Sequence, residues 1–278
     1  MYYTLRMKRK TVLITGCSSG IGYDCAKALA KEYKVIATAR KKEDVARLKN
    51  EGFEAYRLDV TKSEEIEKVL KIVLKNHKEL YALFNNAGYG QPGAIEDISK
   101  EVLQAQFETN FFGMWDITQK TLKIFRKQGY GRILNHSSVL GLVSLKFRGA
   151  YNASKYAVEA LDDTLRLELA GSEIYVSTIN TGPVRSRFRE NAVAMFFKNI
   201  DYKNSSYAKE YEKELIEAKE SSTAAFSRGS DVVIANIRHA LKAKNPSPRY
   251  YNTEATWLLA FLKRVLPTSW LDALLKRI

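Results

Sequence analysis

A tyrosine and a lysine spaced four positions apart are the side chains of this sequence best suited to acid–base chemistry. Tyr151 and Lys155 lie in the stretch YNASKYAVEALDD (151–163), and Ser138 precedes them. A free tyrosine has a pKa of about 10, and a nearby ammonium group favours its phenolate form. On a helix the two side chains would share one face. We therefore expect Tyr151 to exchange a proton with a substrate oxygen that the Ser138 hydroxyl holds.

The spacing alone is weak evidence, because the chain has 16 tyrosines and the pair Tyr23 and Lys27 repeats it. Tyr23 falls on an expected helix just after a glycine-rich loop, and no strand ending in serine is aimed at it. The stretch GRILNHSS (131–138), by contrast, predicts a strand that ends at Ser138. These surroundings favour Tyr151 and Lys155 as the reactive pair.

Short apolar stretches alternate with helical ones and predict the elements that position these residues. Strands are expected at 11–15, 34–39, 54–60, 81–87, 131–138, 175–180 and, weakly, 249–252. Helices are expected at 21–32, 43–50, 100–126, 150–170 and 231–243. A further helix ends near His77, and a capping box formed by Thr61 and Glu64 marks its start.

Strands that are apolar throughout, each followed by a helix, indicate a parallel sheet covered on both faces. With right-handed crossovers this gives an α/β fold, a Rossmann-like doubly wound parallel sheet of about seven strands. No linker or repeat divides the chain, so we expect a single domain over residues 1–278. Ligands of such sheets bind beyond the carboxyl ends of the strands.

The loop TGCSSGIG (15–22) joins the first expected strand to the first helix. Its glycines allow a tight turn and the close approach of a ligand, and the N–H groups of a helix N-terminus bind phosphate. A glycine-rich turn in this position predicts a dinucleotide site. A flexible turn without a ligand is the alternative.

Arg40 ends the second expected strand, where an acidic residue would bind the ribose of NAD. A guanidinium group suits a 2′-phosphate instead, so we predict NADP(H) as the cofactor in preference to NAD(H). Lys41 and Lys42 follow, and a solvated run of charge is the alternative interpretation. Asp59, at the end of the third strand, is placed to accept a hydrogen bond from adenine.

Six motifs follow one another along the chain: TGCSSGIG (15–22), NNAG (85–88), Asn110, Ser138, Tyr151-x-x-x-Lys155 and NTGPVRS (180–186). In this order they resemble the short-chain dehydrogenase/reductase family over about residues 10–190. The resemblance implies that Tyr151 is the acid/base, Ser138 binds the substrate oxygen, and Lys155 holds the nicotinamide ribose and lowers the tyrosine pKa. It implies that Asn110 positions a water in a proton relay to Lys155, and that the NNAG stretch stabilises the central sheet and borders the adenosine.

The same resemblance implies a set of cofactor contacts. They are Gly16, Ser18, Ser19, Gly20, Ile21, Gly22, Arg40, Asp59, Val60, Asn86, Ala87, Gly88, Tyr151, Lys155, Gly182, Val184 and Ser186. The sequence departs from the family pattern at Thr181-Gly182, where Pro-Gly is usual, and at Ser186, where threonine is common. This departure predicts a less rigid loop after the sixth strand and leaves the chemistry unchanged.

Longer stretches narrow the resemblance to the branch with retinol dehydrogenases and 17β-hydroxysteroid dehydrogenases, and to bacterial NADP-dependent aldehyde reductases. They are LFNNAGYGQPGAIED, TNFFGMWDIT, SSVLGLVS and GAYNASKYAVEAL. We therefore expect an oxidoreductase that interconverts apolar aldehydes or ketones and alcohols, and a homo-oligomer. The alternative is an NADPH-binding regulatory protein with little turnover, which need not retain the reactive set.

Composition limits the other possibilities. The net charge of +14 attracts anions, but no basic helix or aromatic platform supports nucleic-acid binding. Two cysteines, Cys17 and Cys25, imply no disulfide framework and fit a cytoplasmic protein. No cluster of histidine, cysteine and acidic residues suggests a metal site. No apolar run is long enough to span a membrane.

Two segments and one histidine have open interpretations. Residues 186–228 form an insertion in which Phe196, Phe197 and the helically spaced Tyr207, Tyr211 and Leu215 make either a substrate lid or ordinary packing. Residues 257–278 mix tryptophan, leucine and basic residues in two short amphipathic helices separated at Pro267. They would contact the inner face of a membrane, another subunit or the substrate pocket. His136 either touches the substrate or is packed and hydrogen-bonded.

Overall fold

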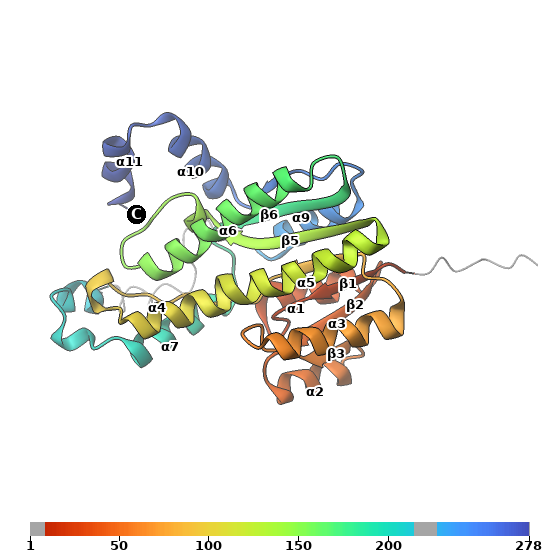
Figure 1. The fold of residues 1–278 in the computed structure, drawn as a ribbon. Helices are drawn as coiled ribbons and strands as arrows, with labels where there is room; N and C mark the ends of the chain where they lie inside the picture. The colour runs from red at the N-terminus through yellow and green to blue at the C-terminus, as the bar shows by residue number, and fades with distance from the viewer. Residues whose placement is uncertain (1–8, 214–226, 278) are drawn as a thin grey trace, which may run out of the picture.

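The computed structural model describes residues 9–213 and 227–277, and its centre is a parallel sheet of seven strands (Figure 1). The strand order is β3-β2-β1-β4-β5-β6-β7. The strands are β1 (Thr11–Ile14), β2 (Lys34–Ala39), β3 (Glu54–Arg57), β4 (Ala82–Asn85), β5 (Tyr130–Ser138), β6 (Glu173–Thr181) and β7 (Arg249–Tyr251). This confirms the predicted fold class, including the weak seventh strand.

The direction of the strand order reverses between β1 and β4, which lie side by side at the centre of the sheet. Val12, Leu13 and Ile14 of β1 are paired with Ala82, Leu83 and Phe84 of β4. All six residues are fully buried, because helices cover both faces. The reversal opens a crevice at the carboxyl ends of these strands, where ligands of doubly wound sheets bind.

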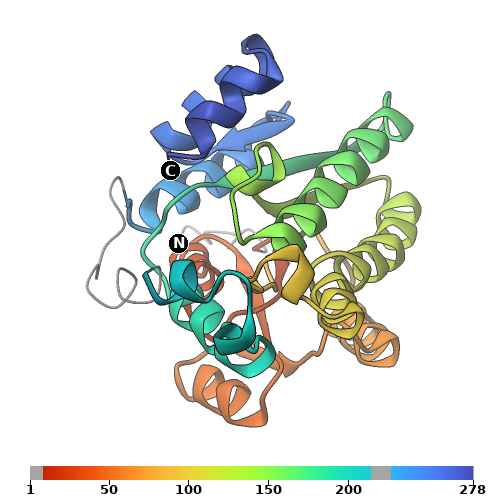
Figure 2. The same cartoon turned by 90° about the vertical axis from the view of Figure 1, so that its left-hand side faces the viewer.

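Two sets of helices cover the two faces. One core cluster joins the sheet to α1 (Gly20–Leu29), α2 (Lys42–Asn50) and α9 (Asp231–Lys242). The other joins it to α3 (Ser63–His77), α5 (Gly113–Gln128) and α6 (Gly149–Glu168). In Figure 2 these layers are seen from the end toward which β5 points.

The remaining helices gather at that end of the molecule. They are α4 (Lys100–Phe107), α7 (Phe188–Asn199), α10 (Glu254–Val265) and α11 (Thr268–Leu275). Figure 1 shows β5 pointing toward the side that α7, α10 and α11 occupy. The split of the C-terminal segment at Pro267 is confirmed, because Pro267 is the N-cap of α11.

The predicted capping box of α3 is wrong. The N-cap is Lys62, and no side chain caps the helix. The Thr61 hydroxyl and N–H both donate to Asp59 Oδ1, at 2.8 and 3.0 Å. Asp59 therefore organises a turn before the helix, and this local side-chain bond removes Thr61 from capping.

Candidate active site

Four adjacent strands of the sheet, β1, β4, β5 and β6, end at the site. The loop after β1 contains Gly16, the segment after β4 contains Asn86, β5 ends at Ser138, and Gly182 follows β6. Strands β1, β4, β5 and β6 are neighbours in this order. The fold thus gathers residues that lie more than 160 positions apart in the sequence.

Side chains that directly follow β1 and β4 hold the glycine loop in place. The Thr15 hydroxyl accepts hydrogen bonds from the N–H groups of Asn86 and Ala87, both at 3.0 Å. Asn86 Nδ2 donates to the carbonyl oxygens of Thr15 and Gly16, also at 3.0 Å. A Cβ on Gly22 would lie 2.3 Å from Asn86 Nδ2, so only glycine fits at this contact.

The loop leaves the first turn of α1 free to bind an anion. The N-cap Ser19 makes no side-chain capping bond, and the first turn holds no acidic residue. Gly16 and Gly20 have φ values of +71° and +59°, a conformation that favours glycine. Ser18, Ser19 and Gly20 are each partly accessible. Uncapped N–H groups at a helix N-terminus are a phosphate site, so the loop fits the pyrophosphate of a dinucleotide.

Basic side chains surround this loop, and one of them was not foreseen. Arg40 is exposed at the carboxyl end of β2, as expected. Arg47 of α2 also reaches the loop: its Nη2 donates to the Ser18 carbonyl oxygen at 2.5 Å. Its guanidinium lies over the Tyr23 ring, 5.4 Å from the centroid, and pairs with Glu51. Tyr23 is therefore a packing partner of Arg47, outside the reactive set.

The other adenosine-side candidates lie at the end of β3. Asp59 is half-buried and uses Oδ1 in the turn with Thr61. Val60 is buried, and its carbonyl oxygen packs against Gly113, where a Cβ would lie 2.6 Å away. Contacts of either residue with adenine remain predictions.

Ser138, Tyr151 and Lys155 meet where β5 faces α6. The Ser138 hydroxyl hydrogen-bonds the Tyr151 phenol, and it also accepts from the Leu140 N–H at 3.1 Å. Lys155 Nζ lies 5.7 Å from the centroid of the Tyr151 ring and donates to the His136 carbonyl oxygen at 2.6 Å. The three side chains that the sequence singled out therefore form one cluster.

Burial controls the charges of this cluster. Burial raises the pKa of Tyr151 to about 12, and the hydrogen bond with Ser138 opposes this shift. Burial lowers the pKa of Lys155 to about 8, against the charges of Glu159 and Asp162. Lys155 donates to the His136 carbonyl oxygen in this arrangement, and a lowering of the Tyr151 pKa by Lys155 remains a prediction.

Asn110 lies on a single π-helical turn, Glu108–Phe112, between α4 and α5. Its Oδ1 accepts from the Tyr89 N–H at 3.0 Å, and its Nδ2 donates to the Tyr89 carbonyl oxygen at 2.9 Å and Ser154 Oγ at 3.3 Å. A Cβ on Gly88 would lie 3.1 Å from Asn110 Oδ1. Asn110 therefore ties the segment after β4 to α6, and a water relay to Lys155 remains a prediction.

His136 is a structural residue, as the second of its two interpretations held. Its Nδ1 bonds Asn86 Oδ1 at 3.0 Å, and its Nε2 bonds Thr181 Oγ1 at 2.9 Å. Because Asn86 presents an acceptor, Nδ1 carries the proton and Nε2 accepts from Thr181. Burial, with the charge of Lys155, lowers the pKa of His136 to about 3, so the ring is neutral. His136 therefore links Asn86, which holds the glycine loop, to Thr181 of β6.

The segment after β6 brings an aromatic ring onto Tyr151. Ser186 lies against the glycine loop, with its Cβ 3.3 Å from the place of a Cβ on Gly20. Two residues later, Phe188 begins α7, and its ring centroid is 5.4 Å from that of Tyr151. A Cβ on Gly90 would lie 2.9 Å from the Phe188 ring. Phe188 is thus a side chain of the insertion that packs on Tyr151, and the sequence did not single it out.

The insertion residues with two open interpretations, a substrate lid or ordinary packing, differ from one another. Phe196 is buried, and its ring centroid lies 5.0 Å from that of Tyr211, in a core cluster with Phe147. Phe197 is exposed and packs on Tyr202. Phe196 therefore belongs to ordinary packing, the second of the two interpretations. Leu215 lies outside the described residues.

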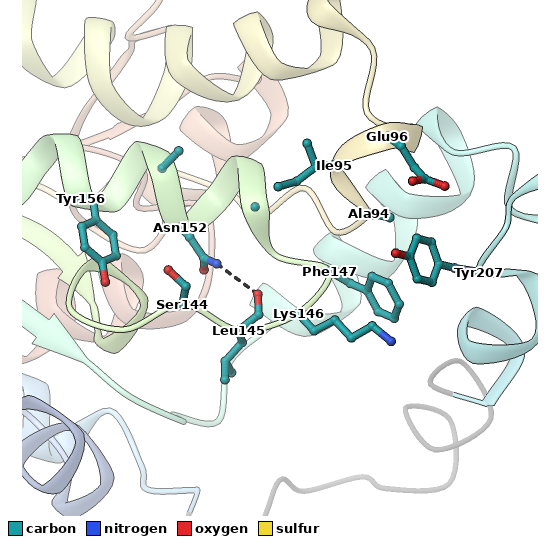
Figure 3. A pocket seen from close by; sticks show the side chains of 13 residues that line it. Ala94, Ile95, Glu96, Ser144, Leu145, Lys146, Phe147, Asn152, Tyr156 and Tyr207 are labelled. Atoms are coloured by element: carbon teal, nitrogen blue, oxygen red, sulfur yellow. Dashed lines mark hydrogen bonds between the residues drawn. The ribbon is translucent and has the colours of Figure 1, made fainter. Parts of the chain in front are cut away.

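A hollow of about 550 Å³ lies beside the core cluster of Phe147, Phe196 and Tyr211 (Figure 3). It is lined by Ile95, by the loop 144–147, by Asn152 and Tyr156 of α6, and by Tyr207. Asn152 Nδ2 donates to the Leu145 carbonyl oxygen at 3.1 Å and closes one wall. Tyr151 and Lys155 are not among its lining residues, although Asn152 is. The hollow is therefore separate from the group formed by Ser138, Tyr151 and Lys155.

The comparison with protein families decides the identity. The model of the family described as short chain dehydrogenase matches residues 10–195. The chain belongs to the short-chain dehydrogenase/reductase family. It is therefore an oxidoreductase by family, and the matched region contains every catalytic candidate.

Relatives and solved structures agree with this assignment. An uncharacterized oxidoreductase of Escherichia coli strain K12, YbbO, is 38% identical over 98% of this chain and 96% of its own length. Retinol dehydrogenase 8 of Bos taurus is 32% identical over 93% of this chain and 86% of its own. The actinorhodin polyketide ketoreductase with NADPH superimposes with a TM-score of 0.71 at 25% identity, covering 87% of this chain and 94% of that one.

Within residues 9–213 and 227–277, no group of three or more histidine, cysteine or acidic side chains could hold a metal ion. No helix in the same ranges is long and apolar enough to cross a bilayer.

Proposed function

We propose that this protein is an NADP(H)-dependent reductase and dehydrogenase that interconverts apolar aldehydes or ketones and alcohols. The observation that carries the proposal is the contact of the Tyr151 phenol with the Ser138 hydroxyl, next to Lys155 and beside the glycine loop. Retinoids and steroids are candidate substrates, because retinol dehydrogenase 8 is similar along most of the chain.

The side chains divide the work on the carbonyl group. The bound cofactor supplies the hydride, and the protein must supply the proton and hold the substrate. Ser138 donates a hydrogen bond to the carbonyl oxygen as negative charge develops on it. Tyr151 gives its proton to the same oxygen and takes it back in alcohol oxidation. Lys155 brings a positive charge within one helical turn of the phenol.

Two features support NADP(H) over NAD(H). Arg40 and its lysine neighbours occupy the end of β2, and Arg47 stands at the glycine loop. Guanidinium groups bind phosphate oxygens in a bidentate manner. A cytoplasmic location and a homo-oligomeric state are further parts of this proposal.

The test is NADPH oxidation with aliphatic aldehydes, aromatic aldehydes, retinal and steroid ketones, run with two matched variants. Tyr151→Phe should lose at least about 100-fold in kcat, as expected when a general acid is removed. Tyr23→Phe, which has the same local spacing to a lysine, should keep its activity. Full activity in Tyr151→Phe would show that the proton comes from elsewhere. NADPH binding without turnover of any substrate would favour the regulatory alternative.

A further inference from the structure

The helices α10 and α11 carry an unusual amount of exposed apolar surface. Trp257, Leu258, Phe261 and Val265 of α10 are 60%, 49%, 49% and 54% exposed, and Trp270 of α11 is 68% exposed. The spacing of the four α10 residues places them on one face of the helix. The rings of Trp257 and Phe261 stack, with centroids 5.9 Å apart and an interplanar angle of 5°.

The opposite side of these helices is fixed to the body of the protein. Leu271 is buried against Val139 and Val143, in a cluster that Leu259 and Leu262 complete. Val139 follows Ser138 directly. At the start of α10, Thr253 is the N-cap, and its Oγ1 would lie 2.2 Å from a Cβ on Gly182. The exposed face is therefore held rigidly next to the active site.

Unpaired cations accompany this face. Lys263 and Arg264 end α10, and Lys276 and Arg277 follow α11. All four are exposed, and none forms an ion pair within the described ranges 9–213 and 227–277. The neighbouring Glu254 is already paired with Arg228. The positive charges around this face are therefore available to an anionic partner.

We propose that the outer face of α10 and α11 docks this protein on the surface of an anionic lipid bilayer. Tryptophan and phenylalanine partition into the interface, where basic residues meet lipid phosphates. A second copy fits the same face poorly, because each chain carries a net charge of +14 and unpaired cations around the patch. In Figures 1 and 2 the two helices project from one end of the molecule, so a flat surface can reach them.

Docking in this orientation has a consequence for substrate access. The same helices contact the residues that follow Ser138 and β6. The mouth of the active site would then open beside the bilayer, from which lipophilic carbonyl compounds enter it. This consequence rests on the proposed function, whereas the docking itself does not.

The experiment is co-sedimentation of the full chain with vesicles of phosphatidylcholine, with and without phosphatidylglycerol. We expect binding to the anionic vesicles that falls as salt is raised, with a blue shift of tryptophan emission. The double variant Trp257→Ser/Phe261→Ser should bind at least tenfold more weakly, as should Lys263→Glu/Arg264→Glu. The matched control Leu103→Ser/Leu167→Ser changes exposed apolar residues elsewhere and should bind as the unchanged chain does.

Three results would overturn the proposal. They are no binding of the unchanged chain to anionic vesicles, unchanged binding of Trp257→Ser/Phe261→Ser, and a lipid-free dimer that this variant dissociates, which would assign the face to a second copy. Circular dichroism of each variant shows that it is folded. Because vesicle binding needs no turnover, failure of docking is distinguishable from failure of the proposed enzymatic activity.

Discussion

No cation of residues 9–213 or 227–277 is hydrogen-bonded to the Tyr151 phenol. Its neighbour Ser138 is neutral, and Lys155 donates to the His136 carbonyl oxygen. With a pKa of about 12 the phenolate is rare at neutral pH, and alcohol oxidation needs it as a base. We therefore expect the phenol to act as a base only when a further positive charge, such as that of an oxidised nicotinamide ring, lies beside it. Proton transfer would then depend on cofactor binding.

Arg40 is the residue from which we predict a preference for NADP(H). Replacing Arg40 with Asp removes a guanidinium group and adds a carboxylate that repels a 2′-phosphate and suits a ribose hydroxyl. We expect the ratio of kcat/KM for NADP to that for NAD to fall by about 10- to 100-fold, the usual worth of a charged hydrogen bond. The control Lys27→Asp makes the same charge change on an exposed site of α1. An unchanged ratio in Arg40→Asp would contradict the prediction.

At the residue scale, the sequence predicted which side chains belong to the candidate site better than it predicted their hydrogen-bond partners. Ser138, Tyr151 and Lys155 were recognised because chemistry requires those types at a strand end and on the following helix. The contacts of Arg47 with Ser18 and of His136 with Asn86 and Thr181 join different elements. No spacing within one segment encodes such contacts, since they depend on how the elements pack.

At the scale of the element, α7 decides what covers the active site. Local patterning drew attention to the apolar run AVAMFF (192–197), but Phe196 faces a core that includes Tyr211. The first residue of the helix, Phe188, covers Tyr151. Apolarity alone cannot tell which ring faces the core and which faces the site, because that depends on where the helix begins. The start of α3 was missed for another reason, because Thr61 bonds Asp59 instead of capping the helix.

Two phenylalanines of α7 give a matched test of this cover. Phe188→Ala removes the ring above Tyr151, whereas Phe197→Ala removes a similarly exposed ring that packs on Tyr202. A pocket that loses apolar contacts changes in selectivity by about 1–3 kcal/mol. We expect Phe188→Ala to raise the ratio of kcat/KM for steroid ketones to that for short aldehydes by at least about tenfold.

The comparison with Phe197→Ala decides the interpretation. That variant should leave the selectivity ratio unchanged, since its ring lies away from the reactive phenol. Equal changes in both variants would mean that α7 acts through general packing rather than through one ring on Tyr151.

At the scale of the whole molecule, a chain of buried amides and one carboxylate crosses the sheet. Asn85 of β4 donates to Asn135 of β5 at 2.8 Å, and Asn135 donates to Asp162 of α6 at 2.5 Å. Thr178 of β6 donates to the other oxygen of Asp162 at 2.8 Å. The seven-strand architecture was predictable from apolar strands, but this polar seam was not, because asparagines in strands carry no periodic signal.

Asp162 makes the stability of the fold depend on pH. Burial raises its pKa to about 7, and the Glu159 charge adds to the shift. The unfolded value is about 3.9, so the folded state favours the protonated acid. The stability that this group contributes is fully present below about pH 4 and is lost as the pH rises through about 7. A shift of about three units corresponds to at most about 4 kcal/mol.

Replacing Asp162 with Asn keeps the shape of the side chain and removes its titration. The difference in the free energy of unfolding between this variant and the unchanged chain should therefore vary with pH. Between about pH 5 and pH 8, urea unfolding should show the stability of the unchanged chain falling relative to Asp162→Asn, by up to about 2.6 kcal/mol. The neighbour Asp163 is the control: its pairs with Arg249 and Arg166 lower its pKa. Asp163→Asn should therefore cost a nearly constant amount over the same range, because that carboxylate is ionised throughout. A stability difference for Asp162→Asn that does not vary with pH would contradict the prediction. It would mean that Asp162 keeps its negative charge in the folded protein, within the chain of hydrogen bonds that joins Asn85, Asn135 and Thr178.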